Sequence, residues 1–172
     1  MGYESSIENM VRYVNDIAGI RISCSFTSDI YLIADMISKQ NDLTILARRD
    51  YMKNPKKSGY RSYHMLVTTP VFLSDSIIDT KVEIQIRTVA QDFWATLEHK
   101  MHYKFEGDGP DYITKELREC ARYVAELDTR MEELNNEIQK YGNYQIKNKN
   151  PRKTRSAPAV GLPGYYYEKI YV

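Results

Sequence analysis

Residues 81–88 (KVEIQIRT) carry the most informative pattern in the chain, because apolar and polar side chains alternate along them. In a β-strand successive side chains point to opposite faces, so the apolar residues can close against a core while the polar ones share the other face. The polar set is Glu83, Gln85 and Arg87. A carboxylate, an amide and a guanidinium in one row suit ligand recognition, although polar side chains are also common on the exposed face of an antiparallel sheet.

A second carboxylate, Asp16, precedes a short stretch that contains Ala18 and Gly19. Small residues at this point let a ligand or a neighbouring backbone approach closely. If the strand that follows lies beside the strand of Glu83, the two carboxylates can converge on one cation. Mg²⁺ commonly takes one or two carboxylates together with phosphate oxygens and water. The alternative is that Asp16 is an ordinary turn or helix-end residue.

Residues 53–64 (KNPKKSGYRSYH) supply the opposite charge. Four basic side chains lie close together in this segment: Lys53, Lys56, Lys57 and Arg61. Lysines bind phosphates as point charges, and Tyr60, which follows the flexible Gly59, can stack on a base. Arg48 and Arg49 extend the basic patch from the preceding strand. A solvated loop would show the same composition.

Glu98, His99 and His102 fall on one expected helix, where the two histidines are three residues apart. No cysteine or third histidine completes a zinc-binding set around them. We expect Glu98 and His99 to line the same cleft as Glu83 instead. The sequence contains neither the GxxxxGK[ST] loop nor the GxGxxG fingerprint, so any nucleoside phosphate is bound without those devices.

The elements that must position these residues follow from hydrophobic periodicity and turn residues. Helices are predicted at 4–14, from residue 28 onward, at 89–103 and at 111–141. The second of these is amphipathic, with an inner stripe of Ile30, Ile33, Ala34 and Ile37. Strands are predicted from residue 20 onward and at 43–49, 62–69 and 77–87, with a loop at 50–62. Mixed strands with interposed helices indicate an α/β or α+β sheet domain.

The predicted helix at 111–141 has apolar residues spaced alternately by four and three positions, which is a heptad stripe. Two interpretations stay open: the helix lies on its own domain, or it pairs between subunits. From residue 142 the chain is basic, rich in Pro and Gly, and lacks an apolar period. The predicted division is therefore a domain over 1–141 and a mobile tail over 142–172, whose last residues (YYYEKIYV) can dock as a strand or helix end.

Composition narrows the function classes. A chain of 172 residues can form one domain with a real core, and a net charge of +1 means that anion binding must come from local clustering. Cys24 and Cys120 show no metal or redox spacing, and there is no secretory segment and no apolar run of membrane-spanning length, so we expect a cytoplasmic protein without membrane contact. RNA binding through the basic loop and tail is a further possibility, against which the net charge counts.

Four segments, DIAGIR, KNPKKSGYRSYH, VEIQIRT and FWATLEHKMHYKF, together resemble the synthetase domain of the RelA/SpoT family, and most of all its small, single-domain alarmone synthetases. They stand in the family's order and span roughly residues 15 to 105. The resemblance implies a nucleotidyltransferase-like mixed β-sheet flanked by helices, with a long C-terminal helix. It also implies transfer of the β,γ-pyrophosphate of ATP to the 3′-hydroxyl of GDP or GTP, which makes ppGpp or pppGpp, the alarmones of the stringent response.

The resemblance assigns a role to individual residues. Asp16 and Glu83 would bind Mg²⁺, with Glu83 also accepting the proton of the 3′-hydroxyl. On the ATP side, Ala18 would contact the nucleotide, and Arg21 and Arg49 would sandwich the adenine. The residues assigned to the guanosine substrate are Lys56, Tyr60, His64, Gln85 and Glu98, with Tyr60 stacking on the guanine.

Members of the family also carry a basic segment that grips the ATP phosphates, upstream of the helix before DIAGIR. In this sequence no Arg or Lys precedes Arg12. The leading hypothesis is therefore a pyrophosphokinase that lacks this segment. The alternative is a weakened or non-catalytic homologue that keeps the guanine-nucleotide half of the site. The long helix fits the homotetramers that these small enzymes form.

Overall fold

The computed structural model describes residues 18–104, 110–149 and 170–171, with side chains for 18–101 and 110–141. The helix expected at 4–14 and the candidate ligand Asp16 lie outside the described residues. The described elements are, in order, β1 (Ala18–Cys24), α2 (Thr27–Ser38), β2 (Thr44–Asp50), β3 (Tyr63–Phe72), β4 (Ile77–Thr88), α3 (Val89–Lys104), α4 (Asp111–Lys149) and β5 (Ile170–Tyr171).

The strands form one mixed sheet in the order β2-β3-β4-β1-β5. β2, β3 and β4 pair antiparallel, whereas β1 pairs parallel with β4 and antiparallel with the two-residue β5. A parallel pair needs a long connection, and here the intervening chain contains α2, β2 and β3. The architecture is α+β, as predicted, and β5 shows that part of the terminal segment docks as a strand.

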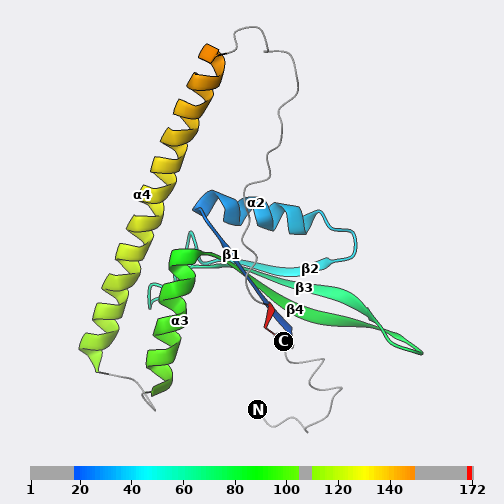
Figure 1. The fold of residues 1–172 in the computed structure, drawn as a ribbon. Coiled ribbons are helices and arrows are strands. Elements are labelled where there is room, and N and C mark those ends of the chain that lie inside the picture. The colour runs from blue at the N-terminus through cyan, green and yellow to red at the C-terminus, as the bar shows by residue number, and fades with distance from the viewer. Residues whose placement is uncertain (1–17, 105–109, 150–169, 172) are drawn as a thin grey trace.

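The main core lies between one face of this sheet and α2 (Figure 1). The predicted inner stripe of α2 is confirmed, since Ile30, Ile33 and Ala34 are buried. The sheet contributes the apolar alternation of β1, β3 and β4: Cys24, Met65, Val67, Val82, Ile84 and Ile86. Because a strand alternates, the residues between these point to the sheet face that α2 does not cover.

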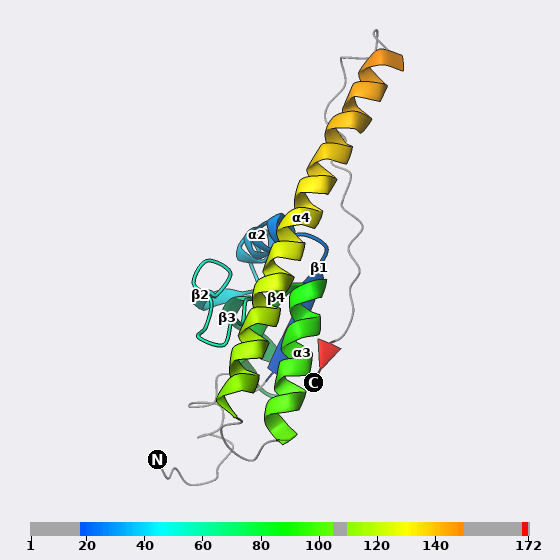
Figure 2. The ribbon, with the colours of Figure 1, turned by 90° about the vertical axis from the view of Figure 1, so that its left-hand side faces the viewer.

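A second, smaller cluster joins α3 to the first half of α4, and consists of Trp94, Ala95 and Ala121. The indole nitrogen of Trp94 donates a hydrogen bond to the carbonyl oxygen of Leu117 at 3.0 Å, which ties the two helices together. Both helices stand beside the end of the sheet where β4 runs into α3 (Figures 1 and 2). The second half of α4 extends beyond the sheet and α2 in both views.

The predicted end of the long helix at residue 141 is wrong, because α4 continues to Lys149. The segment after residue 142 is basic, but no proline interrupts the chain before Pro151. Proline disfavours the helical conformation of the residue that precedes it, and in its absence the helix can propagate through residues 142–149. Among the described residues, no helix is long and apolar enough to cross a membrane.

Candidate active site

A single row of side chains crosses four strands on the sheet face opposite α2. The Cα partners Arg49 and His64, His64 and Gln85, and Gln85 and Arg21 connect β2, β3, β4 and β1 in register. Residues directly opposite each other on paired strands share a face, so all four side chains stand on the same side. Glu83 lies two residues before Gln85 on β4, on the same face, and pairs with Gly19 on β1.

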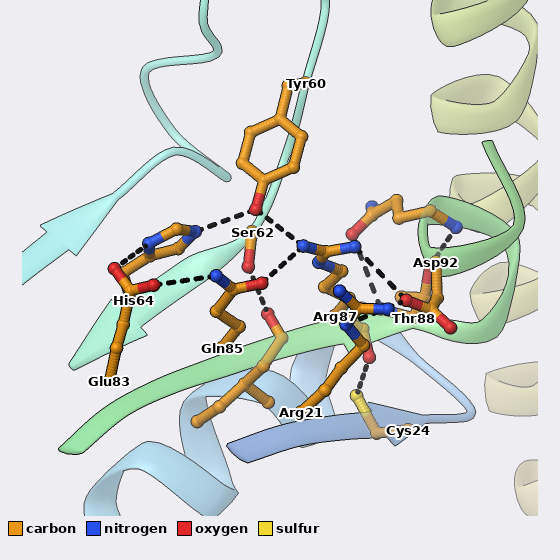
Figure 3. A network of polar contacts seen from close by, with 12 residues as sticks. Arg21, Cys24, Tyr60, Ser62, His64, Glu83, Gln85, Arg87, Thr88 and Asp92 are labelled. Atoms are coloured by element: carbon orange, nitrogen blue, oxygen red, sulfur yellow. Dashed lines mark hydrogen bonds and ion pairs between the residues drawn. The ribbon is translucent and has the colours of Figure 1, made fainter. Parts of the chain in front are cut away.

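Five side chains on this face close into a hydrogen-bonded ring (Figure 3). Going around it, Glu83 Oε1 bonds His64 Nδ1 at 3.0 Å, and His64 Nε2 bonds the hydroxyl of Tyr60 at 2.8 Å. Arg87 Nη2 then donates to the hydroxyl of Tyr60 at 2.8 Å and also to Gln85 Oε1. Gln85 Nε2 completes the ring by donating to Glu83 Oε2 at 2.8 Å.

The directions of these hydrogen bonds follow from the chemistry of the groups. A guanidinium only donates, so the hydroxyl of Tyr60 accepts from Arg87 and keeps its own proton for His64 Nε2. Neutral His64 then carries its proton on Nδ1 and donates it to Glu83. Both arms of the ring therefore begin at Arg87 and end on the carboxylate of Glu83, which accepts on both oxygens.

The electrostatics agree with this direction. Burial lowers the pKa of His64, more strongly than Glu83 raises it, so the imidazole is neutral near pH 7. For Glu83 burial acts to raise the pKa, but the hydrogen bonds from Gln85 and His64 outweigh it and leave the pKa lowered. Burial raises the pKa of Tyr60 despite the nearby Arg87, so its hydroxyl keeps the proton that it donates. The ring thus holds an ionised carboxylate.

Asp92, in the first turn of α3, balances the charge of the buried guanidinium. Its Oδ1 accepts from Arg87 Nη1 at 3.2 Å and lies 3.4 Å from Arg21 Nε (Figure 3). One carboxylate therefore connects the arginine of the ring with the arginine on β1.

Two adjoining hollows open beside the ring. The smaller one, about 260 Å³, is lined by Gly19, Ile20, Arg21, Glu83 and Gln85. The larger one, about 570 Å³, shares Arg21 and Gln85 with it and extends between the 50–62 loop and α3. Among its other lining residues are Lys56, Tyr60, Arg87, Glu98 and His99. Glu83 thus borders the small hollow, and Tyr60 the large one.

The basic side chains of the 50–62 loop do not gather into one cluster. Lys56 Nζ lies 4.8 Å from the ring centroid of Tyr60 and 5.0 Å from that of Tyr51, at the large hollow. Lys53 instead lies over Tyr31 of α2, and Arg61 donates to the carbonyl oxygen of Met52. Of the loop's basic side chains, Lys56 is therefore the one that meets both the large hollow and the aromatic rings beside it.

A family model described as "Region found in RelA / SpoT proteins" matches residues 3–108. The chain belongs to the RelA/SpoT family. It is 44% identical over 137 residues to the GTP pyrophosphokinase YwaC of Bacillus subtilis (strain 168), a match that covers 80% of this chain and 65% of YwaC. It is 40% identical over 129 residues to the GTP pyrophosphokinase YjbM of the same organism, covering 75% and 61%.

Solved structures of the RelA/SpoT family share the fold. The crystal structure of the small alarmone synthetase 1 from Bacillus subtilis bound to its product pppGpp superimposes with a TM-score of 0.74 at 38% identity, covering 78% of this chain and 69% of that one. The small alarmone synthetase 2 from Bacillus subtilis gives a TM-score of 0.71 at 42% identity, covering 80% and 77%. The chain spans less than two thirds of the length of YwaC or of YjbM.

Within this RelA/SpoT chain, most of the predicted site residues come together. They are Arg21, Lys56, Tyr60, His64, Glu83, Gln85 and Glu98, which line the two hollows or belong to the ring. Glu98 and His99 line the large hollow together, whereas Glu83 borders the adjoining small one, so the three residues do not share one hollow as predicted. Among the described residues, no group of three or more His, Cys, Asp and Glu side chains could hold a metal ion.

Three predicted residues lie outside the ring and are not among the lining residues of the two hollows. Arg49 is exposed at the β2 end of the row, on the same face as Arg21 but three strands away. Ala18 packs against the main core and so points to the opposite face. Arg48 also points to that face, where it donates to Ser38 of α2, so it does not extend the basic patch.

Sequence reasoning placed Arg87 on the polar face but gave it no role, and it missed Asp92. Spacing could not reveal their ion pair, because five residues across a strand–helix junction match no regular period. An Asp in the first turn of a helix is also the ordinary complement of the helix dipole. One signal could have revealed the pair: an arginine at a buried strand end needs a carboxylate nearby, and Asp92 is close in the sequence.

Proposed function

We propose that this chain transfers the β,γ-pyrophosphate of ATP to the ribose 3′-hydroxyl of GDP or GTP and so makes ppGpp or pppGpp. The observation that carries the proposal is the position of Glu83, an ionised carboxylate that lines the small hollow and accepts a hydrogen bond from Gln85, which lines both hollows. A reaction between two nucleotides needs such a group between two binding sites. The names of YwaC and YjbM, both GTP pyrophosphokinases, support the same activity.

The guanosine substrate belongs in the large hollow. Tyr60 offers an aromatic face for the base, Lys56 offers a cation for the phosphates, and Glu98 and Gln85 offer polar groups for the base or ribose. The bound product pppGpp of the related synthetase is a guanine nucleotide, in line with this assignment.

ATP belongs on the side of Arg21, above the open face of the sheet. Three strand spacings of about 4.8 Å separate the backbones of Arg21 and Arg49, roughly 14 Å in all. Two extended arginine side chains can span that gap and enclose a flat base between them. The contact of Ala18 with ATP stays a prediction and would have to use its backbone, since its side chain packs in the core.

The carboxylate of Glu83 can serve as a ligand of Mg²⁺. Each oxygen of Glu83 accepts one hydrogen bond and retains capacity for a cation. Asp16, the second proposed ligand, stands three positions before Gly19, the β1 partner of Glu83. A bound Mg²⁺ would neutralise phosphate charge during the transfer.

Glu83 would also accept the proton of the attacking hydroxyl. Its lowered pKa keeps it ionised at neutral pH but makes it a weak base, so most of the acceleration must come from positioning and charge neutralisation. That division is expected for phosphoryl-type transfers, in which the protein does little covalent chemistry.

Glu83→Gln tests the proposal, because it removes the negative charge and keeps the size of the side chain. With ATP, Mg²⁺ and GDP or GTP, the parent should release AMP and a 3′-pyrophosphorylated nucleotide, both separable by anion-exchange chromatography. The variant should form no product while it still binds GDP in calorimetry. Glu116→Gln, which alters an exposed carboxylate on α4, is the matched control. Equal rates for parent and Glu83→Gln would remove Glu83 from the mechanism.

We also propose that α4 mediates a homo-oligomer, with a tetramer as the expected form, and that the protein works in the cytoplasm, where its nucleotide substrates are found. The heptad stripe is divided: Leu117 and Val124 are half-buried against the domain, whereas the later positions are exposed. Those exposed positions are Leu127, Met131, Leu134 and Ile138. Light scattering should report a multimer for the parent and a smaller mass for Leu134→Glu.

A further inference from the structure

Arg87 differs from the other four members of the ring because it can only donate hydrogen bonds. It lies near the end of β4 with its side chain 5% exposed, and its charge is balanced by Asp92. Its two terminal nitrogens serve three acceptors: the hydroxyl of Tyr60, Gln85 Oε1 and Asp92 Oδ1. A buried guanidinium in this position therefore determines the orientation of the hydrogen-bonding groups around it.

The short arm of the ring fixes an amide. Gln85 presents its oxygen to Arg87 and its nitrogen to Glu83 Oε2. A flipped amide would place N–H groups against the guanidinium and an oxygen against the carboxylate, which are two repulsive contacts. Arg87 therefore determines which end of Gln85 meets Glu83.

The long arm fixes a tautomer. While Arg87 occupies the hydroxyl oxygen of Tyr60, the hydroxyl proton points to His64 Nε2 and the imidazole proton stays on Nδ1, facing Glu83 Oε1. Without Arg87, Tyr60 could accept from a proton on Nε2 instead. Nδ1 would then turn a lone pair toward the carboxylate, and Glu83 would lose this hydrogen bond.

We propose that Arg87 is a positioning residue that orients Gln85, Tyr60 and His64, and through them holds both oxygens of Glu83 in place. The inference rests on the proposed function only in that Glu83 is the group that must be held. It predicts that the two arms act together, and that removing Arg87 frees the Tyr60 hydroxyl to accept from His64 Nε2.

The experiment uses Arg87→Met, Arg87→Lys and Tyr60→Phe in the full chain. Arg87→Lys keeps the charge beside Asp92 but lacks the planar fork that reaches three acceptors. Tyr60→Phe removes only the hydroxyl and leaves the buried Arg87–Asp92 pair intact, so the kinetic test survives if a change at Arg87 prevents folding. Tyr31→Phe is the control, because it deletes a tyrosine hydroxyl that bonds Asp50 and stands outside the ring.

The first readout is the position of the His64 ring proton at pH 8 in the nucleotide-free protein, from two-bond ¹H–¹⁵N correlations. The signal is assigned by its loss in His64→Gln. We expect Nδ1–H in the parent, in Tyr31→Phe and in Tyr60→Phe, where Nε2–H would have no hydroxyl to accept it, and a shift toward Nε2–H in both Arg87 variants. A proton that stays on Nδ1 in both Arg87 variants would overturn the proposal.

The second readout is kinetic. Tyr60→Phe and Arg87→Met should each lower kcat on the order of 10–100-fold, as small misplacements of reacting groups do, while the Kd for GDP changes far less. The double variant should be little worse than Arg87→Met, because Arg87→Met already cuts both arms and Tyr60→Phe cuts only the long one. Effects on kcat that multiply would show that Arg87 does not act through Tyr60.

The two readouts distinguish a failure of the proposed function from a failure of the positioning role of Arg87. A parent that makes no pyrophosphorylated product, with a His64 proton that still moves in the Arg87 variants, refutes the proposed function and supports the positioning by Arg87. An active parent whose His64 proton does not move refutes the positioning alone.

Discussion

A Cβ atom placed on Gly59 would lie 2.5 Å from the Cβ of Ala121 on α4, closer than two carbon atoms can approach. Gly59 also has φ +93°, a conformation that residues with a side chain rarely adopt. The loop that carries Lys56 and Tyr60 therefore rests on α4 only because residue 59 lacks a side chain. This contact links the guanosine side of the site to the long helix.

Gly59→Ala is expected to displace the loop and weaken GDP binding, because the new methyl group meets Ala121 and the backbone is strained. Overpacking and strain together should destabilise the protein by about 1–3 kcal/mol. Adding Ala121→Gly should restore part of the loss, since it removes the clash but not the strain. Thermal unfolding and calorimetry measure both effects. No recovery in the double variant would mean that the contact with α4 is not the cause.

Tyr60→Ala should weaken GDP binding by about 1–3 kcal/mol, by analogy with the stacking of bases on aromatic side chains. Tyr112→Ala, which truncates a tyrosine of α4 that is 69% exposed, is the control and should bind GDP as the parent does. Isothermal titration calorimetry gives both affinities. An unchanged affinity in Tyr60→Ala would place the base elsewhere.

Asp128 of α4 joins the long helix to the β4–α3 junction, because its Oδ2 accepts from Thr88 Oγ1 and Gln91 Nε2, both at 2.7 Å. Removing the acceptor in Asp128→Ala leaves two buried donors unpaired and should cost about 1–3 kcal/mol of unfolding free energy. Asp128→Asn keeps an oxygen in the place of Oδ2 and should be much milder. Urea denaturation of the two variants compares them directly.

Asp128 also predicts a dependence on pH. Burial raises its pKa above the ordinary value of 3.8, although Thr88 and Gln91 oppose the shift. The folded state then binds this proton more tightly than the unfolded state, so the stabilisation is complete below about pH 3.8 and is lost as the pH rises through the folded pKa. Asp128→Asn should therefore gain stability relative to the parent between pH 4 and pH 7. A constant difference across that range would contradict the raised pKa.

The two cysteines should differ in reactivity. Burial, assisted by the charge of Asp29, raises the pKa of Cys24 to about 12, and its thiol donates to the carbonyl oxygen of Arg87 at 3.0 Å. Cys120 is exposed on α4. Because the thiolate is the reactive form, the native protein at pH 8 should release colour from one thiol with Ellman's reagent and from two after denaturation. Rapid reaction of two thiols in the native state would refute the burial of Cys24.

The face of each strand could be predicted from the sequence, because a period of two depends only on backbone geometry. Glu83 and Gln85 were placed on one face by this argument, and Arg21 falls on the same face as both. The inner stripe of α2 followed in the same way from the helical period. The resemblance to the RelA/SpoT family then supplied roles that spacing alone does not give.

What could not be predicted depends on contacts between distant elements. The ion pair of Arg87 with Asp92 depends on the angle at which α3 leaves β4, and the division between Arg48 and Arg49 depends on the register of β2 against β3. The heptad stripe of α4 fits a domain-facing helix and a subunit-facing helix equally. Its first part is half-buried against the domain, and its second part is exposed, so that part is available for the proposed contact between subunits.

The row of side chains from Arg49 to Arg21 depends on the correct register of four strands, and the core enforces that register during folding. A slip of any of the four strands by one residue would carry its polar side chain from the open face into the apolar layer beneath α2, and would lift an apolar side chain into the site. Misaligned pairings are therefore penalised by the core before any nucleotide is encountered. Buried residues such as Met65 and Ile84 lie on the sheet face opposite the site. Their burial helps to enforce the strand register on which the alignment of the site residues depends.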